Sequence, residues 1–142
     1  MAITSAITTS FKVEALKGVH NFTADNDQFK LALYTSSATM GAATTAYSTA
    51  QEASGTNYTA KGAFLTSITP VASGTTAIVD FSDLTFGTAT VTARGCMIFN
   101  EVASGDPAVC VVDFGGDKTS TAGNFTIVFP AANATAAIIR LA

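Results

Sequence analysis

Two apolar runs flank a short polar link in residues 89–115. The first run includes residues 96–99, the second includes residues 109–112, and a Ser-Gly-Asp-Pro segment lies between them. Runs rich in β-branched and apolar residues that are separated by turn residues are typical of two antiparallel strands. Because both runs are almost continuously apolar, we expect strands that are covered on both faces and lie in the middle of a sheet.

Further strand patterns surround this predicted hairpin. Phe29, Leu31 and Leu33 alternate with more polar positions in residues 28–35, which is the period of a half-buried strand. Other strands are predicted at residues 58–69, 75–81, 84–86, 124–129 and 135–141, with a bulge or close backbone approach at Gly62, an end at Pro70 and a glycine-rich turn at residues 115–117. About eight antiparallel strands without alternating helices predict an all-β fold, either a β-sandwich or an open barrel.

One short helix is expected before these strands. Ile3, Ile7 and Phe11 recur four residues apart, which predicts an amphipathic helix over residues 4–17, and Gly18 supplies a stop. A single short helix is not stable alone, so it must lie against its own sheet or against a neighbour.

The composition bounds the domain organisation and the surface. The 142 residues fit a single β domain, 1–142, in which residues 1–18 form an N-terminal helical arm. Charged residues make up 12% of the chain and hydrophobic residues 48%, whereas an average soluble domain has about 25% charged residues. A surface with so little charge favours a protein that covers much of itself with partners.

Charge and hydropathy argue against two classes of partner. The net charge is −3, and the seven Lys and Arg residues form no cluster, so we expect no nucleic-acid partner. No apolar run has the length of a membrane span, so we expect no membrane partner. The first residues lack the basic and apolar regions of a secretory signal, which predicts synthesis in a cytoplasm.

The cysteines, the single histidine and the D-x-D pair are expected to have structural roles. Cys96 and Cys110 fall on the two predicted hairpin strands and could lie close enough to bridge, although two buried thiols are favoured in a reducing cytoplasm. His20 is the only histidine and is expected at the junction between helix and sheet. Asp25 and Asp27 form a D-x-D without the glycine and glutamate of an EF-hand loop, so a solvated turn is favoured.

Two carboxylate pairs could in principle support glycoside hydrolysis. Asp113 and Asp117 flank a Gly-Gly pair, and Asp80 and Asp83 flank a Phe-Ser pair. Carboxylates at strand ends are common turn formers, so this interpretation is the weaker one. We therefore expect no catalytic residue, no metal site and no cofactor, and a protein that is not an enzyme.

Three segments are candidates for contact with neighbours. Residues 36–56 form a long stretch without periodicity, and loops of that length in compact domains are usually functional or ordered by a partner. The N-terminal residues 1–17 carry an apolar stripe, and residues 101–107 form the tip of the predicted hairpin. The candidate interface residues in these segments are Ile3, Ile7, Phe11, Met40, Tyr47 and Val102.

Several ordered motifs follow the predicted helix. They are LALYTSSAT, GTNYTAKG and VVDFGGDKTS. This order resembles a family of small virion structural proteins of tailed bacteriophages, in which a short N-terminal helix precedes an LALYTSSAT-like strand, a GTxYTAxG segment and a later VDFGxDKTS element. The similarity covers nearly the whole chain, and none of its motifs carries chemistry.

The resemblance implies a capsid cement or decoration protein. Such a protein would bind the major capsid protein on the exterior of the virion, form a homotrimer with copies of itself and be made in the cytoplasm of a host bacterium. A tail or baseplate structural protein, or a host-adhesion subunit, is the first alternative. A soluble enzyme that acts on glycans through Asp113 and Asp117 is the second.

Overall fold

The computed structural model describes residues 2–23 and 28–142, and within them the protein is all-β with one short helix, as the sequence predicts. The strands form two antiparallel sheets and no closed barrel. The five-stranded sheet has the order β1 (Ala6–Ile7), β7 (Ala108–Ile127), β6 (Leu84–Asn100), β2 (Phe29–Tyr34) and β3 (Ala63–Phe64). The three-stranded sheet has the order β4 (Ser67–Ser73), β5 (Thr76–Phe81) and β8 (Ile139–Leu141).

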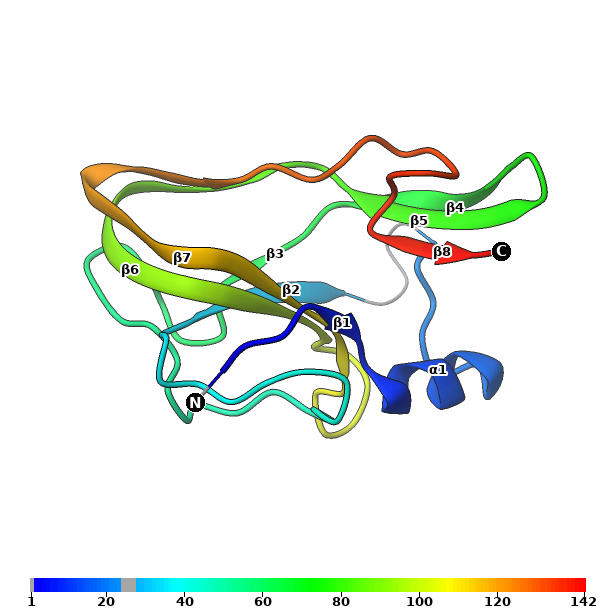
Figure 1. The fold of residues 1–142 in the computed structure, drawn as a ribbon, viewed down its shortest axis with the longest axis horizontal. Coiled ribbons are helices and arrows are strands. Elements are labelled where there is room, and N and C mark those ends of the chain that lie inside the picture. Colours follow the sequence, from blue (N-terminus) through cyan, green and yellow to red (C-terminus); the bar gives the residue numbers. More distant parts are fainter. Residues whose placement is uncertain (1, 24–27) are drawn as a thin grey trace.

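The predicted central hairpin is confirmed as β6 and β7. Strand β6 lies between β2 and β7, and therefore in the middle of the sheet. The hairpin is long enough to bend over itself, so that β6 runs from the upper layer in Figure 1 into the lower one and β7 runs from the lower layer back into the upper one. Four register shifts interrupt the pairing of β6 with β7, and bulges of this kind increase strand bending and twist.

The bend explains two wrong predictions in this region. Residues 84–86 and 124–129 were expected to form separate strands, but residues 84–86 begin β6 and β7 continues through residues 115–117 to Ile127. Gly115 has φ of +81° and lies beside the register shift between Ala93 and Gly95, so the glycine pair allows a bulge instead of a turn.

The predicted strand at residues 58–69 is two strands in different sheets. β3 pairs with β2, whereas β4 pairs with β5 and continues through Pro70, which was expected to end the strand. β4 is an edge strand, and its register shift between Ile68 and Val71 leaves Pro70 unpaired, so the missing N–H is tolerated. At the other end of the chain, only Ile139–Leu141 of the predicted residues 135–141 form a strand.

The helix is shorter than the sequence predicts. α1 (Thr9–Leu16) begins after Thr8, whose Oγ1 accepts a hydrogen bond from Phe11 N at 3.1 Å and donates one to Ala108 O at 3.0 Å. Ile3 and Ile7 lie before the helix in extended chain, where Ile3 bridges to Met40 and Ile7 pairs with Cys110. The predicted start at residue 4 is therefore wrong, because β1 pairs with β7 and Thr8 caps the helix.

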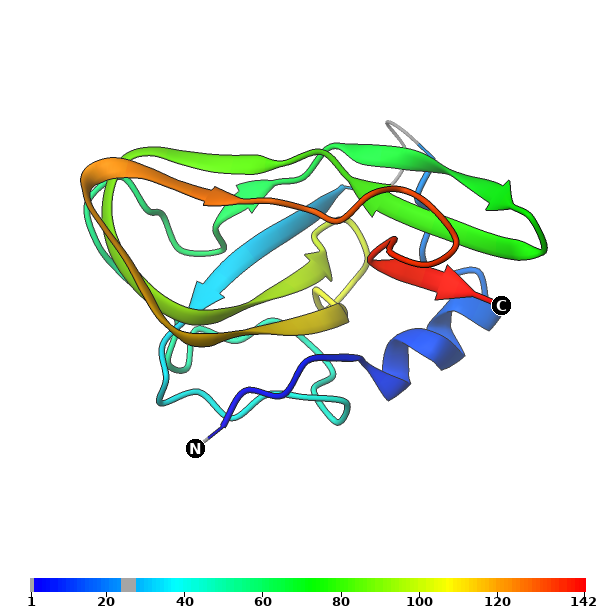
Figure 2. The same cartoon turned by 45° about the horizontal axis from the view of Figure 1, so that its top comes forward.

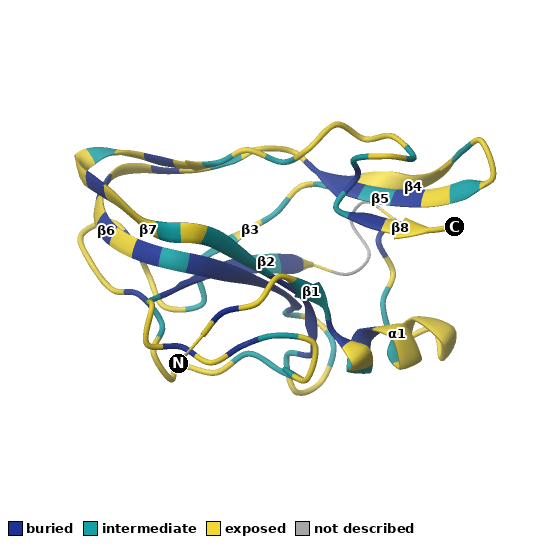
Figure 3. Ribbon diagram, viewed as in Figure 1, coloured by how far each residue is buried: buried dark blue, intermediate teal, exposed yellow. Residues whose placement is uncertain are grey.

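Apolar side chains pack on both faces of the five-stranded sheet. Cys96 and Ile98 of β6 belong to the main core between the two sheets. Met97 and Phe99 belong to a second cluster on the opposite face. Figure 3 shows the resulting burial along β2, along the last part of β6 (residues 95–100) and along the first part of β7 (residues 108–111), whereas the earlier part of β6 alternates between buried and exposed residues. The expected two-sided coverage of the central strands is confirmed.

Candidate functional site

The long segment 36–56 covers the outer face of the five-stranded sheet. Met40 is buried there, and the Tyr47 ring stacks on Phe99 with 4.8 Å between ring centroids. Backbone hydrogen bonds hold the segment to the β6–β7 link, including Tyr47 N to Asp106 O at 3.0 Å. The segment is thus ordered by its own chain.

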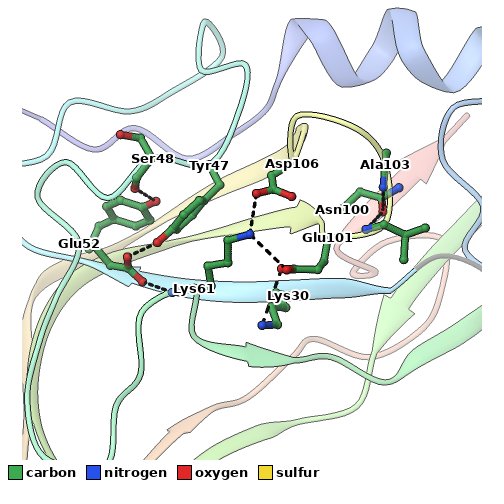
Figure 4. A network of polar contacts seen from close by, with 11 residues as sticks. Lys30, Tyr47, Ser48, Glu52, Lys61, Asn100, Glu101, Ala103 and Asp106 are labelled. Carbon is green, nitrogen blue, oxygen red and sulfur yellow. Dashed lines mark hydrogen bonds and ion pairs between the residues drawn. The ribbon is translucent and has the colours of Figure 1, made fainter.

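Glu52 is the centre of the polar contacts that fix this segment (Figure 4). Its Oε1 accepts hydrogen bonds from Tyr58 Oη and from Lys61 N, both at 2.8 Å, and its Oε2 accepts from Tyr47 Oη. Tyr58 Oη also accepts from Leu33 N at 2.8 Å. Burial, and secondarily the hydrogen bond to Glu52, raises the pKa of the Tyr47 and Tyr58 hydroxyls, so both remain donors.

A group of ion pairs continues from Glu52 to the hairpin tip. Lys61 Nζ lies 2.8 Å from Asp106 Oδ2 and 3.2 Å from Glu101 Oε1, and Lys30 Nζ lies 3.7 Å from Glu101 Oε2 (Figure 4). Hydrogen bonds to Asp106 and then Glu101 raise the pKa of Lys61. These pairs are partly exposed, so we assign them a positioning role more than a large stabilising one.

These polar groups are bonded mainly to one another. Both Glu52 oxygens already accept hydrogen bonds, and Lys61 is held between two carboxylates. The network therefore joins the segment 36–56, the residues before β3 and the hairpin tip into one surface.

His20 lies at the junction between helix and sheet, where the sequence places it. Its Nε2 lies 3.1 Å from Glu14 Oε1 on α1, and its Nδ1 lies 3.1 Å from Asn100 Nδ2 at the end of β6. Because an amide NH₂ group only donates, Nδ1 accepts from Asn100 and Nε2 donates to Glu14. The buried ring also lies 4.9 Å from the Phe11 ring, so it links the helix to the core.

The candidate carboxylates have separate environments. Asp113 Oδ1 accepts from Arg94 Nε at 2.8 Å, and this bond lowers the pKa of Asp113. Asp80 is buried, which raises its pKa, and its Oδ1 accepts from Phe81 N. No group of three or more His, Cys, Asp or Glu side chains able to hold a metal occurs in residues 2–23 and 28–142. Asp25 and Asp27 lie outside the described residues.

Cys96 and Cys110 are free, buried thiols. In the hairpin register Cys96 is opposite Val112 and Ile98 is opposite Cys110, so the two thiols lie diagonally on one face of the sheet. Burial raises the pKa of both, that of Cys110 to about 12. Such thiols are poor nucleophiles at neutral pH.

The predicted interface residues have different positions. Ile3, Phe11 and Met40 are buried in their own chain, and Ile7 and Tyr47 are partly buried. Val102, at the hairpin tip, is 55% exposed. The apolar stripe of residues 3–11 thus already has intramolecular partners.

A different set of apolar residues is exposed at one end of the molecule. α1, β4 and β8 all lie toward the right-hand end of the molecule in both orientations, with β8 between β4 and α1 in the views (Figures 1 and 2). Their exposed large apolar residues, together with Val19 just after α1, are Val13, Leu16, Val19, Ile68, Val71 and Leu141, which we call the apolar end. Leu16 is the most exposed, at 93%. Sequence patterns could not identify this set, because its members come from three distant segments.

Comparison with known proteins gives no family assignment. No protein-family model, no curated protein sequence and no solved structure matches the chain. Among the described residues, no helix has the length and apolar character needed to cross a membrane.

Proposed function

We propose that this protein is a structural component of a bacteriophage virion, and specifically a decoration protein that binds the outer lattice of the capsid. The observation that carries the proposal is the apolar end, where Leu16 and its neighbours remain in contact with water. Exposed apolar patches on small domains commonly mark contact surfaces. The resemblance of the ordered sequence motifs to small virion proteins supplies the class of partner.

The partners would be the major capsid protein and further copies of this chain, arranged as a homotrimer. The low proportion of charged residues, 12%, suits a surface that is extensively covered in an assembly. A protein that binds only the assembled lattice stabilises it by mass action. Many copies act together, so each contact can be modest.

The apolar end revises the expected location of these contacts. Ile3, Phe11 and Met40 are occupied within the chain, so the N-terminal segment would act through Val13 and Leu16 on the outer surface of α1. Val102 offers a second, smaller contact at the hairpin tip.

Occupancy on purified particles tests this proposal. We would add the wild-type protein, a Leu16→Asp variant and a Thr121→Asp control to particles that lack the protein, and measure copies per particle by quantitative mass spectrometry. Thr121 is exposed near the bend of the hairpin, away from the apolar end. We expect hundreds of copies for the wild type and the control, and strong loss for Leu16→Asp. A few dozen copies or fewer would instead indicate a tail protein, and no particle association would reject the virion role.

A further inference from the structure

A pocket of about 500 Å³ lies on the inner face of the bent hairpin. Its lining comes from the last part of β6, from β7 before the bend, from β7 and the following residues after the bend, and from the chain leading to β8. Figure 2 shows the two parts of β7 diverging from the bend at the left. β1 pairs with β7 only at Val111 and Cys110, so beyond these residues no described strand covers this side. Volumes of this size are typical of sites for small molecules.

The pocket walls are apolar and incompletely covered. Cys96, Ile98 and Phe125 are buried, whereas Val112 and Phe114 are only partly buried although they pack against the main core. Ile127, after the bend, has the same intermediate exposure. Covering such surface is favourable by roughly 25 cal/mol per Å². The main core is thus accessible from this one side, and an apolar occupant would cover it.

Lys118 gives the pocket a charge at its edge. It is opposite Ala93 in the hairpin register, and Ala93 is completely buried on the inner face, so Lys118 extends from that same face. Within the described residues Lys118 is the only charged residue lining the pocket, and its ammonium group has no hydrogen-bond or ion-pair partner there. Lys30 and Lys61, in contrast, are both paired with carboxylates.

Asn124 provides a second polar group in the lining. Its Oδ1 accepts a hydrogen bond from Thr88 N at 3.3 Å. This bond leaves the amide NH₂ group as a donor, and no described residue accepts from it. Ser120, in contrast, already donates to Ala89 O at 2.8 Å. Lys118 and Asn124 are both exposed to solvent, so among the described residues the pocket offers one cation and one amide donor without a protein partner, and both complement an anion with acceptor oxygens.

We propose that this pocket binds an amphipathic carboxylate, with an unbranched alkyl chain against the apolar walls and the carboxylate group at Lys118 and Asn124. The alkyl chain would cover the incompletely buried apolar walls, and the carboxylate would pair with the exposed ammonium group of Lys118. This inference is independent of the virion role, since it uses a different part of the molecule from the apolar end.

Isothermal titration calorimetry on the full chain tests the proposal with octanoate, decanoate and dodecanoate, each below its micelle-forming concentration, and with decanol as the uncharged probe. We expect one molecule bound per chain and an affinity that rises about fourfold per added methylene group, as expected for burial of an alkyl chain. Decanoate should bind about tenfold or more tightly than decanol, because a charge-assisted hydrogen bond is lost with the alcohol. Failure of the wild-type protein to bind any of the three carboxylates would overturn the proposal.

Four variants, one of them a control, test where the carboxylate binds. Lys118→Gln should weaken decanoate about tenfold and leave decanol unchanged, whereas Lys12→Gln on α1, the matched control, should change neither. Val112→Trp should fill the pocket and abolish binding of both, with Ile127→Phe as a second filling variant if the first does not fold. Binding that Lys118→Gln and the filling variants leave unchanged would overturn the assignment. Loss of self-association in these variants without carboxylate binding would identify a neighbouring copy as the occupant, and would also overturn it.

Discussion

Tyr58 and Glu52 form the polar link between the segment 36–56 and the central sheet. The Tyr58 hydroxyl donates to Glu52 Oε1 at 2.8 Å and accepts from the backbone N–H of Leu33 on β2 at 2.8 Å. Because Leu33 is fully buried, its N–H has no access to water as a substitute. The Tyr58 hydroxyl therefore satisfies a buried N–H group of β2 and, through Glu52, holds the segment 36–56 in place.

Removing this hydroxyl should destabilise the protein. We expect Tyr58→Phe to lower the free energy of unfolding by about 1–3 kcal/mol, because a buried N–H loses its acceptor and Glu52 loses a donor. Tyr47→Phe also removes a bond to Glu52 but leaves the buried Leu33 N–H paired with Tyr58, so it should cost less. Urea unfolding followed by circular dichroism measures both, and equal stability of Tyr58→Phe and the wild type would contradict this role.

The Thr8 hydroxyl should matter both for the helix and for its attachment. It caps α1 through Phe11 N and bonds to Ala108 O at the start of β7. Thr8→Ala should cost about 1–2 kcal/mol of unfolding free energy, as loss of an N-cap does. Thr8→Ser keeps the hydroxyl and is the control. Thermal and urea unfolding that fails to separate the two variants would show that the cap contributes nothing.

Gly62 should tolerate no side chain. It has φ of +68°, and a Cβ atom there would lie 1.8 Å from the carbonyl oxygen of Leu31. Gly105, in the hairpin link, has φ of +85° with nothing within 4 Å of an added Cβ. Gly105→Ala should therefore cost only the backbone term of about 1–2 kcal/mol, whereas Gly62→Ala should cost clearly more or prevent folding. Expression followed by urea unfolding compares them, and equal losses would contradict the close approach.

Asp80 should make stability depend on pH in an unusual direction. Burial raises its folded-state pKa above the unfolded value, so the ionised carboxylate is unfavourable at neutral pH, and the penalty disappears as pH falls through the folded pKa. Asp80→Asn avoids this ionisation. We expect its advantage over the wild type to be greatest at neutral pH and to shrink toward about pH 4. Urea unfolding across this range measures the difference, and an advantage that grows in acid would contradict the assignment.

Asp113 should give the stability the opposite dependence on pH. Arg94 lowers its folded-state pKa, so its contribution is present above the unfolded pKa and is lost as pH falls through the folded pKa. Asp113→Asn should therefore be less stable than the wild type at neutral pH and approach it in acid. The same unfolding series measures this change, and a constant difference at all pH values would argue against an ionic contribution.

The fold could largely be predicted because its main signal is local. The continuous apolarity of residues 96–99 correctly indicates a strand with a core on each face, since alternate side chains of β6 enter different clusters. The glycine pair at residues 115–116 was misinterpreted because a bulge and a turn both require the backbone freedom of glycine. Their distinction depends on pairing with β6, which is not local.

The candidate surfaces were harder to predict for the same reason. The spacing of Ile3, Ile7 and Phe11 fits a helix, yet the first two pack from extended chain, because Ile3 bridges to Met40 and Ile7 pairs with Cys110 of β7. The exposure of Leu16 follows from what its neighbours cover, and the position of Lys118 at the pocket follows from the bend. Sequence periodicity contains neither piece of information.

The alternation of side chains along β6 makes its alignment in the sheet unusually hard to alter. A slip of one position would move Met97 and Phe99 into the space between the sheets and Cys96 and Ile98 beneath the long covering loop, so both clusters would be misfilled together. A one-residue slip of β6 would therefore disrupt the packing on both faces of the sheet at once, and hairpins with this wrong register should unfold again early in folding.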